Sequence, residues 1–296
     1  MSVAAIINPL SGPGADPRAM EQRISFLRDR FRDARVDGTI AVTERPRHAR
    51  DLAAAAVAAG VEVIVAWGGD GTVNEIGTAI AGSASTLGVI PAGSGNGLAV
   101  AIGAPRDPAA AVDVAINGRT RAIDAGEIDG RLFFNIAGIG FDATVARRFN
   151  TLARGSRGMG PYLRIGLHEA WTYRAQTYRI QLDGERLEST ALLIAFANGC
   201  EYGNKACIAP HACIDDGKLE AVIVNDWSVP GRFWNARHLA FRTAQRAPGV
   251  VFRSIDRAVV ECDAPMDYHV DGEPGRSSGP LTIRIRPGLL RVKTAS

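Results

Sequence analysis

The chain has 296 residues, about twice the size of a typical domain, so two compact units are expected, with one large domain as the alternative. Its 46% hydrophobic and 22% charged residues are typical of a globular protein and exclude a mainly disordered, collagen-like or membrane-spanning chain. The formal net charge of +3, from 34 basic and 31 acidic residues, gives no indication of a nucleic-acid partner.

The four cysteines and the N-terminus predict a cytoplasmic protein. Cys200, Cys207, Cys213 and Cys262 lack the spacing of metal ligands, and disulfide frameworks are usually denser and found in smaller chains, so we expect reduced thiols. No basic segment followed by a long apolar stretch opens the chain, and no apolar run reaches about 18 residues. Any membrane contact is therefore expected to be peripheral.

The first 90 residues alternate between short apolar strands and helices. The expected strands are 3–7, 36–42, 61–66 and 87–90, and the expected helices are 18–35, 47–59 and 73–80. Met20, Ile24, Leu27 and Phe31 recur at helical spacing, which predicts that the first helix packs on a sheet. Such alternation predicts a parallel, Rossmann-like sheet.

After about residue 123 the pattern changes to frequent short strands. We expect strands at 132–136, 177–182, 191–197 and 219–224, with helical insertions at 162–173 and 231–244. This part of the chain is therefore predicted to form a second, β-dominated domain.

Two glycine-rich loops follow predicted strands. In the first, 68–72, glycine lets the backbone approach a ligand closely, and the next helix offers its first N–H groups to phosphate. Asp70 could order a metal-bound water or a nucleotide group, with Thr72 and Asn74 as hydrogen-bonding partners. The alternative is an ordinary strand-to-helix turn capped by Thr72.

The second glycine loop, 93–97, offers Ser94 as a phosphate contact, and its alternative is a structural turn. The chain lacks both the P-loop lysine motif and the Rossmann glycine fingerprint. Standard P-loop and dinucleotide-oxidoreductase functions are thus disfavoured, although backbone N–H groups can still bind phosphate.

The order of these motifs resembles the diacylglycerol kinase catalytic-domain family, which includes bacterial lipid kinases and sphingosine and ceramide kinases. The matching strings are Asn8-Pro9-x-Ser11-Gly12, Gly68-Gly69-Asp70-Gly71-Thr72-x-Asn74-Glu75, Pro91-x-Gly93-Ser94-Gly95-Asn96, Asp215-Asp216-Gly217-Lys218-Leu219-Glu220 and Asp271-Gly272-Glu273. The resemblance implies an NAD-kinase/diacylglycerol-kinase-like α/β fold. Its Rossmann-like ATP-binding domain would span 1–123 and a β-sandwich-like domain 124–296, with the extreme C-terminus returning to the first domain.

The resemblance also implies which residues bind ATP with Mg²⁺. They are Asn8, Pro9, Leu10, Ser11, Gly12, Thr43, Gly68, Gly69, Asp70, Gly71, Thr72, Val73, Asn74, Glu75 and Ser94. A second, structural Mg²⁺ would be held by Asp216 with the main-chain carbonyls of Cys213 and Lys218, an oxygen set that suits a hard cation. The alternative for Asp216 is an ordinary Asp-Gly turn.

By the same resemblance, Glu273 is the candidate base that takes the proton from a lipid hydroxyl. Asp271 would support that geometry, and Asp70 completes the candidate catalytic set. A solvent-exposed hairpin turn is the alternative for residues 271–273. Asn96-Gly97 replaces the Asn-Asp of many lipid kinases, so the acceptor lipid stays open.

The leading hypothesis is an ATP- and magnesium-dependent lipid kinase acting on diacylglycerol, a sphingoid base, ceramide or phosphatidylglycerol. An NAD kinase, which shares Gly-Gly-Asp-Gly-Thr, is the runner-up, and residues 73–75, 93–96 and 271–273 count against it. A non-catalytic lipid or nucleotide sensor is the third hypothesis. A homodimer is compatible with each of them.

Two stretches without acidic residues suggest contact with an anionic bilayer. Their basic and aromatic residues are Arg147, Arg148, Arg154, Arg157 and Arg164 in one, and Arg232, Phe233, Trp234, Arg237, Phe241, Arg242 and Arg246 in the other. The alternative is a pair of solvated helices with buried aromatic side chains.

Overall fold

The computed structural model describes residues 1–12, 17–152, 159–203 and 206–295. The chain divides into two compact units, one formed by Met1–Ile123 with Gly288–Ser296 and the other by Asp124–Pro287. Within the described ranges, every helix is too short or too polar to cross a bilayer.

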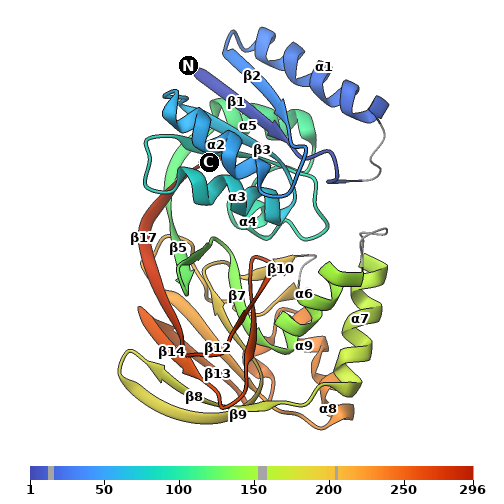
Figure 1. The fold of residues 1–296 in the computed structure, drawn as a ribbon, viewed down its shortest axis with the longest axis vertical. Coiled ribbons are helices and arrows are strands. Elements are labelled where there is room, and N and C mark those ends of the chain that lie inside the picture. Colours follow the sequence, from blue (N-terminus) through green and yellow to red (C-terminus); the bar gives the residue numbers. More distant parts are fainter. Residues whose placement is uncertain (13–16, 153–158, 204–205, 296) are drawn as a thin grey trace. The chain divides into compact units, whose positions relative to one another are not determined.

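The first unit is built on a parallel sheet (Figure 1). Its strands are β1 (Ser2–Ile7), β2 (Asp37–Val42), β3 (Val63–Gly68) and β4 (Thr86–Pro91), and its helices are α1 (Pro17–Asp33), α2 (His48–Ala58), α3 (Asp70–Ile80), α4 (Gly97–Ala101) and α5 (Pro108–Asn117). The strand order is β4-β3-β1-β2, and neighbouring strands pair in parallel.

Helices cover both faces of this sheet. Leu27 and Phe31 of α1 and Val112 of α5 share one core cluster with Val3 and Val65 of the sheet. Helices α2 and α3 pack on each other and on β1 and β3. A parallel sheet needs this double cover because its strands, as the burial of β3 shows, are apolar on both faces.

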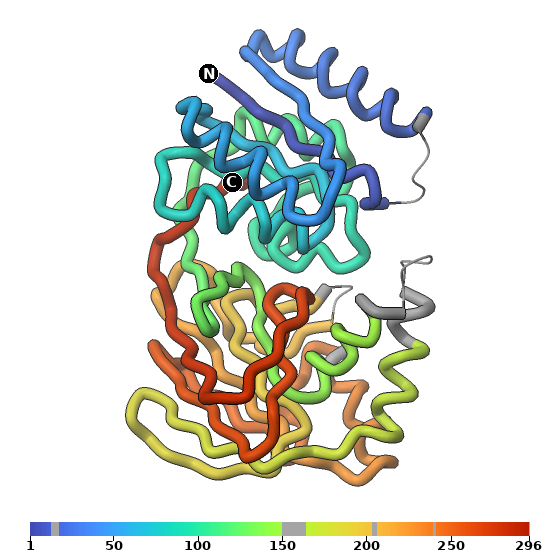
Figure 2. The backbone as a smooth tube through the Cα atoms, viewed as in Figure 1, coloured from blue at the N-terminus to red at the C-terminus, as the bar shows by residue number. Residues whose placement is uncertain are grey.

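The last strand, β17 (Leu281–Thr294), ends inside the first unit. Val292 pairs in parallel with Leu87 of β4, and Leu290 and Val292 are fully buried. Figure 2 shows the red C-terminal end of the chain among the blue and cyan segments of this unit. The Rossmann-like sheet is therefore completed by a residue, Val292, that lies far beyond β4 in the sequence.

The second unit is dominated by antiparallel strands. They are β6 (Arg131–Phe133), β7 (Ile136–Gly140), β8 (Gln176–Leu182), β9 (Glu185–Ala197), β10 (Glu201–Gly203), β11 (Ala206–Cys207), β12 (Leu219–Asn225), β13 (Val250–Ile255), β14 (Arg257–Glu261), β15 (Met266–Val270) and β16 (Glu273–Ser277), with β5 (Arg119–Ile128) entering from the first unit. The helices are α6 (Phe141–Leu152), α7 (Met159–Thr172), α8 (Val229–Asn235), α9 (Arg237–Ala240) and the 3-10 helix η1 (Ala244–Arg246).

The long strand β9 organises this unit. It pairs with β8 over residues 185–191 and with β7 and β12 over its remaining length. Side chains from these strands and from β14, β15 and β17 fill one apolar core, as expected of a sandwich. Together with the parallel sheet of the first unit, this confirms the predicted mixed α/β fold class.

The structure corrects one expectation about the cysteines. Cys200 and Cys207 form a disulfide, while Cys213 and Cys262 are free. The antiparallel pairing of β10 with β11 brings the two Cα atoms to 5.4 Å, within the range that a disulfide requires. The prediction of four reduced thiols is therefore wrong for this pair, which sequence spacing alone did not reveal.

Candidate functional site

The predicted nucleotide-binding loops lie at the carboxyl end of the parallel sheet. Strands β2 and β3 lie on opposite sides of β1, so the loops after β1 and β3 diverge at the carboxyl end of the sheet. Open α/β sheets bind ligands at such a point. Asn8 Nδ2 donates to Thr72 Oγ1 at 2.8 Å, and the Gly69 N–H donates to Ser11 Oγ at 3.3 Å. The structure therefore brings the first two predicted motifs together.

Asp70 joins the first glycine loop to the second. One carboxylate oxygen accepts the Asn96 N–H at 2.8 Å and the other accepts the Gly97 N–H at 2.7 Å. These N–H groups belong to the N-cap residue and the first residue of α4, whose positive helix end favours a carboxylate. Asp70 thus fixes the geometry of both loops, a role that its place in the sequence does not reveal.

The two glycine loops touch backbone to backbone. A Cβ atom added to Gly93 would lie 2.7 Å from the Gly69 Cα atom, which leaves no room for a side chain, and one added to Gly69 would lie 3.1 Å from the Gly93 Cα atom. Asn96, at φ 58°, accepts the Gly93 N–H through Oδ1 and donates to the Gly93 carbonyl through Nδ2. The glycines are thus required by the close approach of the loops, and Asn96 is a site residue that motif reading left unassigned.

Arg23 is a further residue that the sequence analysis missed. Its guanidinium donates to the Ser11 carbonyl at 3.0 Å and lies 5.4 Å from the ring centroid of Trp67 at the end of β3. Partial burial lowers the pKa of Arg23 from its usual value, yet an arginine keeps its charge in any protein environment. Its position between Met20 and Ile24 on a helix expected to face the sheet was the available signal.

The other predicted nucleotide-binding residues lie at the same end of the sheet, and they differ in their hydrogen bonds and in their burial. The Thr43 N–H donates to the Ile7 carbonyl at 2.9 Å, and Glu75 Oε1 accepts the Arg47 N–H at 3.3 Å. Val73 is buried in the core, so only its main chain could meet a ligand. The remaining members are Pro9, Leu10, Gly12, Gly68, Gly71, Asn74 and Ser94, of which Leu10, Gly12 and Ser94 are exposed.

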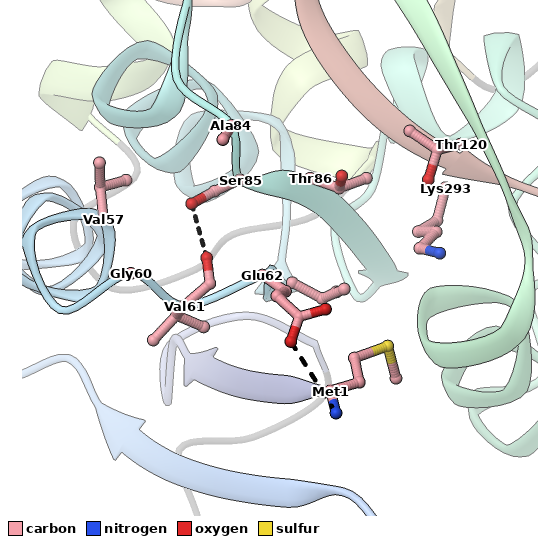
Figure 3. A pocket seen from close by; sticks show the side chains of 11 residues that line it. Met1, Val57, Gly60, Val61, Glu62, Ala84, Ser85, Thr86, Thr120 and Lys293 are labelled. Atoms are coloured by element: carbon pink, nitrogen blue, oxygen red, sulfur yellow. Dashed lines mark hydrogen bonds and ion pairs between the residues drawn. The ribbon is translucent and has the colours of Figure 1, made fainter.

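A hollow of about 300 Å³ lies elsewhere on the first unit (Figure 3). Glu62, Thr86 and Met1 line it at the amino ends of β3, β4 and β1, and Ser85 Oγ donates to the Val61 carbonyl there at 2.7 Å. This is the opposite edge of the sheet from the glycine loops. The hollow is therefore not part of the candidate nucleotide site.

In the second unit, Asp271 and Gly272 form a two-residue hairpin between β15 and β16. Their φ angles of 47° and 86° are typical of a type I′ turn, for which Asp-Gly is a favoured sequence. The Asp271 carboxylate accepts the N–H groups of Phe134, Asn135 and Ile136 at 2.9–3.0 Å. Asp271 therefore ties this turn to the start of β7.

Glu273 follows the turn as the first residue of β16, and its side chain is exposed. Arg131 anchors the main chain there by donating to the carbonyls of Glu273 and Pro274 at 3.4 and 3.2 Å. Residues 271–273 thus do form a hairpin turn, as the alternative predicted. The same hairpin presents the Glu273 carboxylate at the surface, on a backbone that Arg131 holds.

A series of hydrogen-bonded polar side chains connects the hairpin to the interior of the second unit. Tyr202 donates to Asp142 Oδ2 at 2.8 Å, and His269 Nε2 lies 3.2 Å from the same oxygen. The other ring nitrogen of His269 accepts the Gly272 N–H at 3.3 Å, which assigns the proton to Nε2. A Cβ atom on Gly138 would overlap Asp142, so glycine is required for this approach. Motif reading missed both His269 and Asp142.

The predicted structural metal residues lie together in the loop before β12. Asp216 Oδ1 accepts the Lys218 N–H at 3.0 Å, and buried Asp124 accepts the Gly217 N–H at 2.7 Å. The Cys213 thiol donates to Asp215 Oδ1 at 3.3 Å, so only its carbonyl is suited to a hard cation. Among the described residues, no group of three or more His, Cys, Asp or Glu side chains is placed to hold a metal ion.

The arginine-rich stretches divide into different environments. Arg154 and Arg157 lie outside the described residues. Arg147 pairs with Asp267 and Arg148 with Glu169. The side chain of Arg232 is buried and is therefore excluded from direct membrane contact.

The aromatic rings in the second arginine-rich stretch are exposed, which contradicts the alternative of buried aromatic side chains. Trp234 and Phe241 are 69% and 74% exposed, and Phe233 is 39% exposed. The predicted single helix over 231–244 is also interrupted. Arg242 adopts φ 56°, and the Thr243 N–H donates to the His238 carbonyl, a pattern that ends a helix.

Two family models match consecutive parts of the chain. The model described as diacylglycerol kinase catalytic domain matches residues 2–128. The model described as YegS C-terminal NAD kinase beta sandwich-like domain matches residues 135–294. Together the two matched ranges contain every predicted site residue.

Curated relatives and solved structures agree with these matches. A Mycobacterium tuberculosis protein named diacylglycerol kinase is 37% identical over 225 residues, covering 74% of this chain and 71% of the relative. A Klebsiella pneumoniae protein named "Probable lipid kinase YegS-like" is 28% identical over 288 residues, covering 96% and 94%. A solved Bacillus anthracis structure described as a diacylglycerol kinase shares the fold, with a TM-score of 0.73, 19% identity and coverage of 99% and 96%.

Proposed function

Because this chain belongs to the family of diacylglycerol kinases and YegS-like lipid kinases, we propose that it transfers the γ-phosphoryl group of ATP to a hydroxyl of diacylglycerol or a related lipid. The observation that carries the proposal is the pair of glycine loops joined by Asp70 at the carboxyl ends of β1, β3 and β4. The first N–H groups of α3 have no carbonyl partners within the helix, so they are suited to phosphate oxygens.

The residues of the first unit would act mainly by binding and orientation. Ser11, Thr72 and Ser94 offer hydroxyl groups, and Arg23 supplies positive charge that the missing P-loop lysine would otherwise provide. Mg²⁺ bound with ATP supplies further charge neutralisation for phosphoryl transfer. Asp70 would hold the loops in register during the reaction.

In the second unit, Glu273 is the proposed general base. The carboxylate would accept the proton of the lipid hydroxyl as that oxygen attacks the γ-phosphorus atom. Asp271, with its three main-chain hydrogen bonds, would keep the hairpin at a fixed position. The loop of Asp216, with the carbonyls of Cys213 and Lys218, offers an oxygen set that suits a structural Mg²⁺.

The test is transfer of labelled phosphate from ATP with magnesium to diacylglycerol, monoacylglycerol, a sphingoid base, ceramide, phosphatidylglycerol and NAD in mixed micelles. Labelled lipid supports the proposal and identifies the acceptor, whereas labelled NAD supports an NAD kinase. Absence of every product supports the sensor hypothesis.

The base assignment is tested by Glu273→Gln, with Glu188→Gln as a matched exposed carboxylate on β9. We expect Glu273→Gln to lower turnover about 100-fold or more, as loss of general-base catalysis does, while ATP affinity is retained. Equal turnover of the two variants would remove Glu273 from the mechanism.

A further inference from the structure

Helices α7 and α8 present adjacent aromatic side chains to solvent. Leu167, Trp171, Phe233 and Trp234 are 50%, 69%, 39% and 69% exposed, and we name these four residues with Arg237 the aromatic face. Leu167 and Trp171 stand one helical turn apart, and the Trp171 and Phe233 rings lie 6.5 Å apart between centroids. Neighbouring exposed aromatic groups of this kind mark interaction surfaces more often than isolated ones do.

A buried arginine fixes this face in place. Arg232 donates to the carbonyls of Ala170 and Tyr173, at 3.1 and 2.8 Å, and pairs with Asp226 at 2.7 Å. These bonds join the start of α8 to the last turn of α7, whose carbonyl groups favour a positive charge. Trp171 and Phe233, the neighbours of the bonded residues in sequence, are thereby held together while their rings stay in water.

The face carries positive rather than mixed charge. The Arg237 guanidinium carbon lies 4.1 Å from the Trp234 ring centroid, and residues 229–246 contain four arginines and no acidic residue. The nearby carboxylates are already engaged by arginine: Glu169 with Arg148, Asp226 with Arg232, and Glu201 with Arg242. Exposed Arg174 and Arg246 add charge close to the same helices in sequence.

Exposed tryptophan together with arginine fits the boundary between water and lipid. Indole rings are favoured at the headgroup level of a bilayer, and arginine side chains there attract anionic headgroups. A second copy of this chain would bring arginine against arginine, which disfavours self-association through this face. The chemistry thus favours an anionic bilayer over a second protomer.

We propose that the aromatic face, Leu167, Trp171, Phe233, Trp234 and Arg237, docks the protein on an anionic bilayer surface. The proposal rests on the proposed function only in that a kinase of bilayer lipids must work at such a surface. Trp171 and Trp234 enter the headgroup region, and Arg237 contacts lipid phosphate. Arg232 supports the face from inside and does not touch lipid.

The test is sedimentation of the full chain with sucrose-loaded vesicles of phosphatidylcholine, with or without about one-third phosphatidylglycerol. We expect binding to the anionic vesicles, at least tenfold weaker partitioning of Trp171→Ala/Trp234→Ala, and a weaker salt dependence for Arg237→Gln. The matched controls are Val100→Ser, an exposed apolar residue of α4, and Arg186→Gln, an exposed arginine of β9, which should bind as the parent chain does.

Three outcomes would overturn the proposal: no vesicle binding by the parent chain, equal binding by the double variant, or equal binding to neutral and anionic vesicles. Gel filtration of both chains adds a fourth, because a dimer lost in the double variant would assign the face to a second copy. Circular dichroism spectra that match the parent's are required of each variant before it is compared.

Phosphoryl transfer to a short-chain diacylglycerol below its micelle concentration separates this proposal from the proposed function. The double variant should retain parental turnover with that dispersed lipid and lose it only with lipid in vesicles. Failure of the parent chain to phosphorylate any lipid while it binds anionic vesicles would reject the proposed function alone. Equal loss of turnover with dispersed and vesicle lipid would contradict docking as the role of the face.

Discussion

Asp70 shows how a single side chain can organise a binding edge. Its carboxylate receives two main-chain N–H groups from the second glycine loop while its own backbone begins α3. Each of the two carboxylate oxygens accepts one of these hydrogen bonds. Asp70 therefore couples the conformation of the first glycine loop to that of the second.

Asp70→Asn tests this link at the residue scale. The amide replaces one acceptor oxygen by a donor that faces a main-chain N–H, so one hydrogen bond is lost and two donors oppose each other. We expect a loss of about 1–3 kcal/mol in the free energy of unfolding and at least tenfold weaker ATP binding. Urea denaturation and titration calorimetry measure the two effects.

The control is Asp113→Asn on α5, where the carboxylate is 61% exposed and lies 3.8 Å from Arg30. An exposed ion pair of this length contributes little, so this variant should keep parental stability and ATP affinity. If Asp70→Asn resembled this control in both measurements, Asp70 would have no organising role.

At the element scale, the hairpin of β15 and β16 combines a common turn with an uncommon attachment. The part of the chain that the structure describes contains two other Asp-Gly turns with positive φ at both residues, at 129–130 and 183–184. Asp271 accepts three successive N–H groups of another loop, whereas Asp183 accepts two, those of Asp256 and Arg257. The local turn is thus dictated by sequence, and the attachment by tertiary contacts.

Comparison of Asp271→Ala with Asp129→Ala separates these two contributions. Both variants place alanine at a positive φ, which costs roughly 1–2 kcal/mol, and Asp271→Ala also leaves main-chain N–H groups without their acceptor. We expect Asp271→Ala to lose at least about 2 kcal/mol more than Asp129→Ala in urea denaturation. Asp271→Asn, which suits the turn, should fall between them.

Turnover gives the second readout for this hairpin. If Asp271 positions Glu273, Asp271→Asn should lower kcat and leave the KM for ATP nearly unchanged. Matching unfolding free energies for Asp271→Ala and Asp129→Ala would contradict the attachment. Parental kcat in Asp271→Asn would contradict the positioning role.

Other elements show the limits of local pattern. Helix α5 begins at Pro108 after Asp107, whose carboxylate accepts the Ala110 N–H at 2.9 Å, a start signal that the sequence analysis did not use. The helix expected over 231–244 divides into α8, α9 and η1, and no glycine or proline lies inside 232–244 to predict the break. Its end depends on Arg242, whose side chain pairs with Glu201 far away in sequence.

At the scale of the whole molecule, the first unit is not continuous in sequence. Leu290 and Val292 are fully buried in it, and the Lys293 ammonium group donates to the Gly118 carbonyl at 3.0 Å. The Gly82 N–H also donates to the Leu289 carbonyl at 2.8 Å. The parallel sheet therefore depends on the last residues of the chain.

Removal of residues 288–296 should destabilise the first unit. The truncated chain loses the part of β17 that pairs with β4 and the two buried apolar side chains of Leu290 and Val292, each contributing about 1.5–3 kcal/mol. We expect faster cleavage by a protease within residues 1–123, located by mass spectrometry. A chain ending at Thr294 keeps the strand and serves as the control, and equal cleavage of the two chains would show that the strand is dispensable.

The sequence alone determined the parts of this protein that depend on neighbouring residues. Apolar periodicity predicted the alternating strands and helices of the first unit, and the glycine strings identified loops that require positions without Cβ atoms. The order of these strings identified the family to which the chain belongs. Such features are written in short windows, where local sterics and hydrogen bonding decide the outcome.

Only the tertiary structure decided which distant groups meet. The hydrogen bonds of Asp70 to α4, of Asp271 to the start of β7 and of His269 to Asp142 span between 26 and 137 residues, and the disulfide depends on a strand pairing. The exposure of Trp171 beside Phe233 likewise depends on Arg232 joining two helices. Long-range partners are selected by the packing of whole elements, and no local pattern encodes that choice.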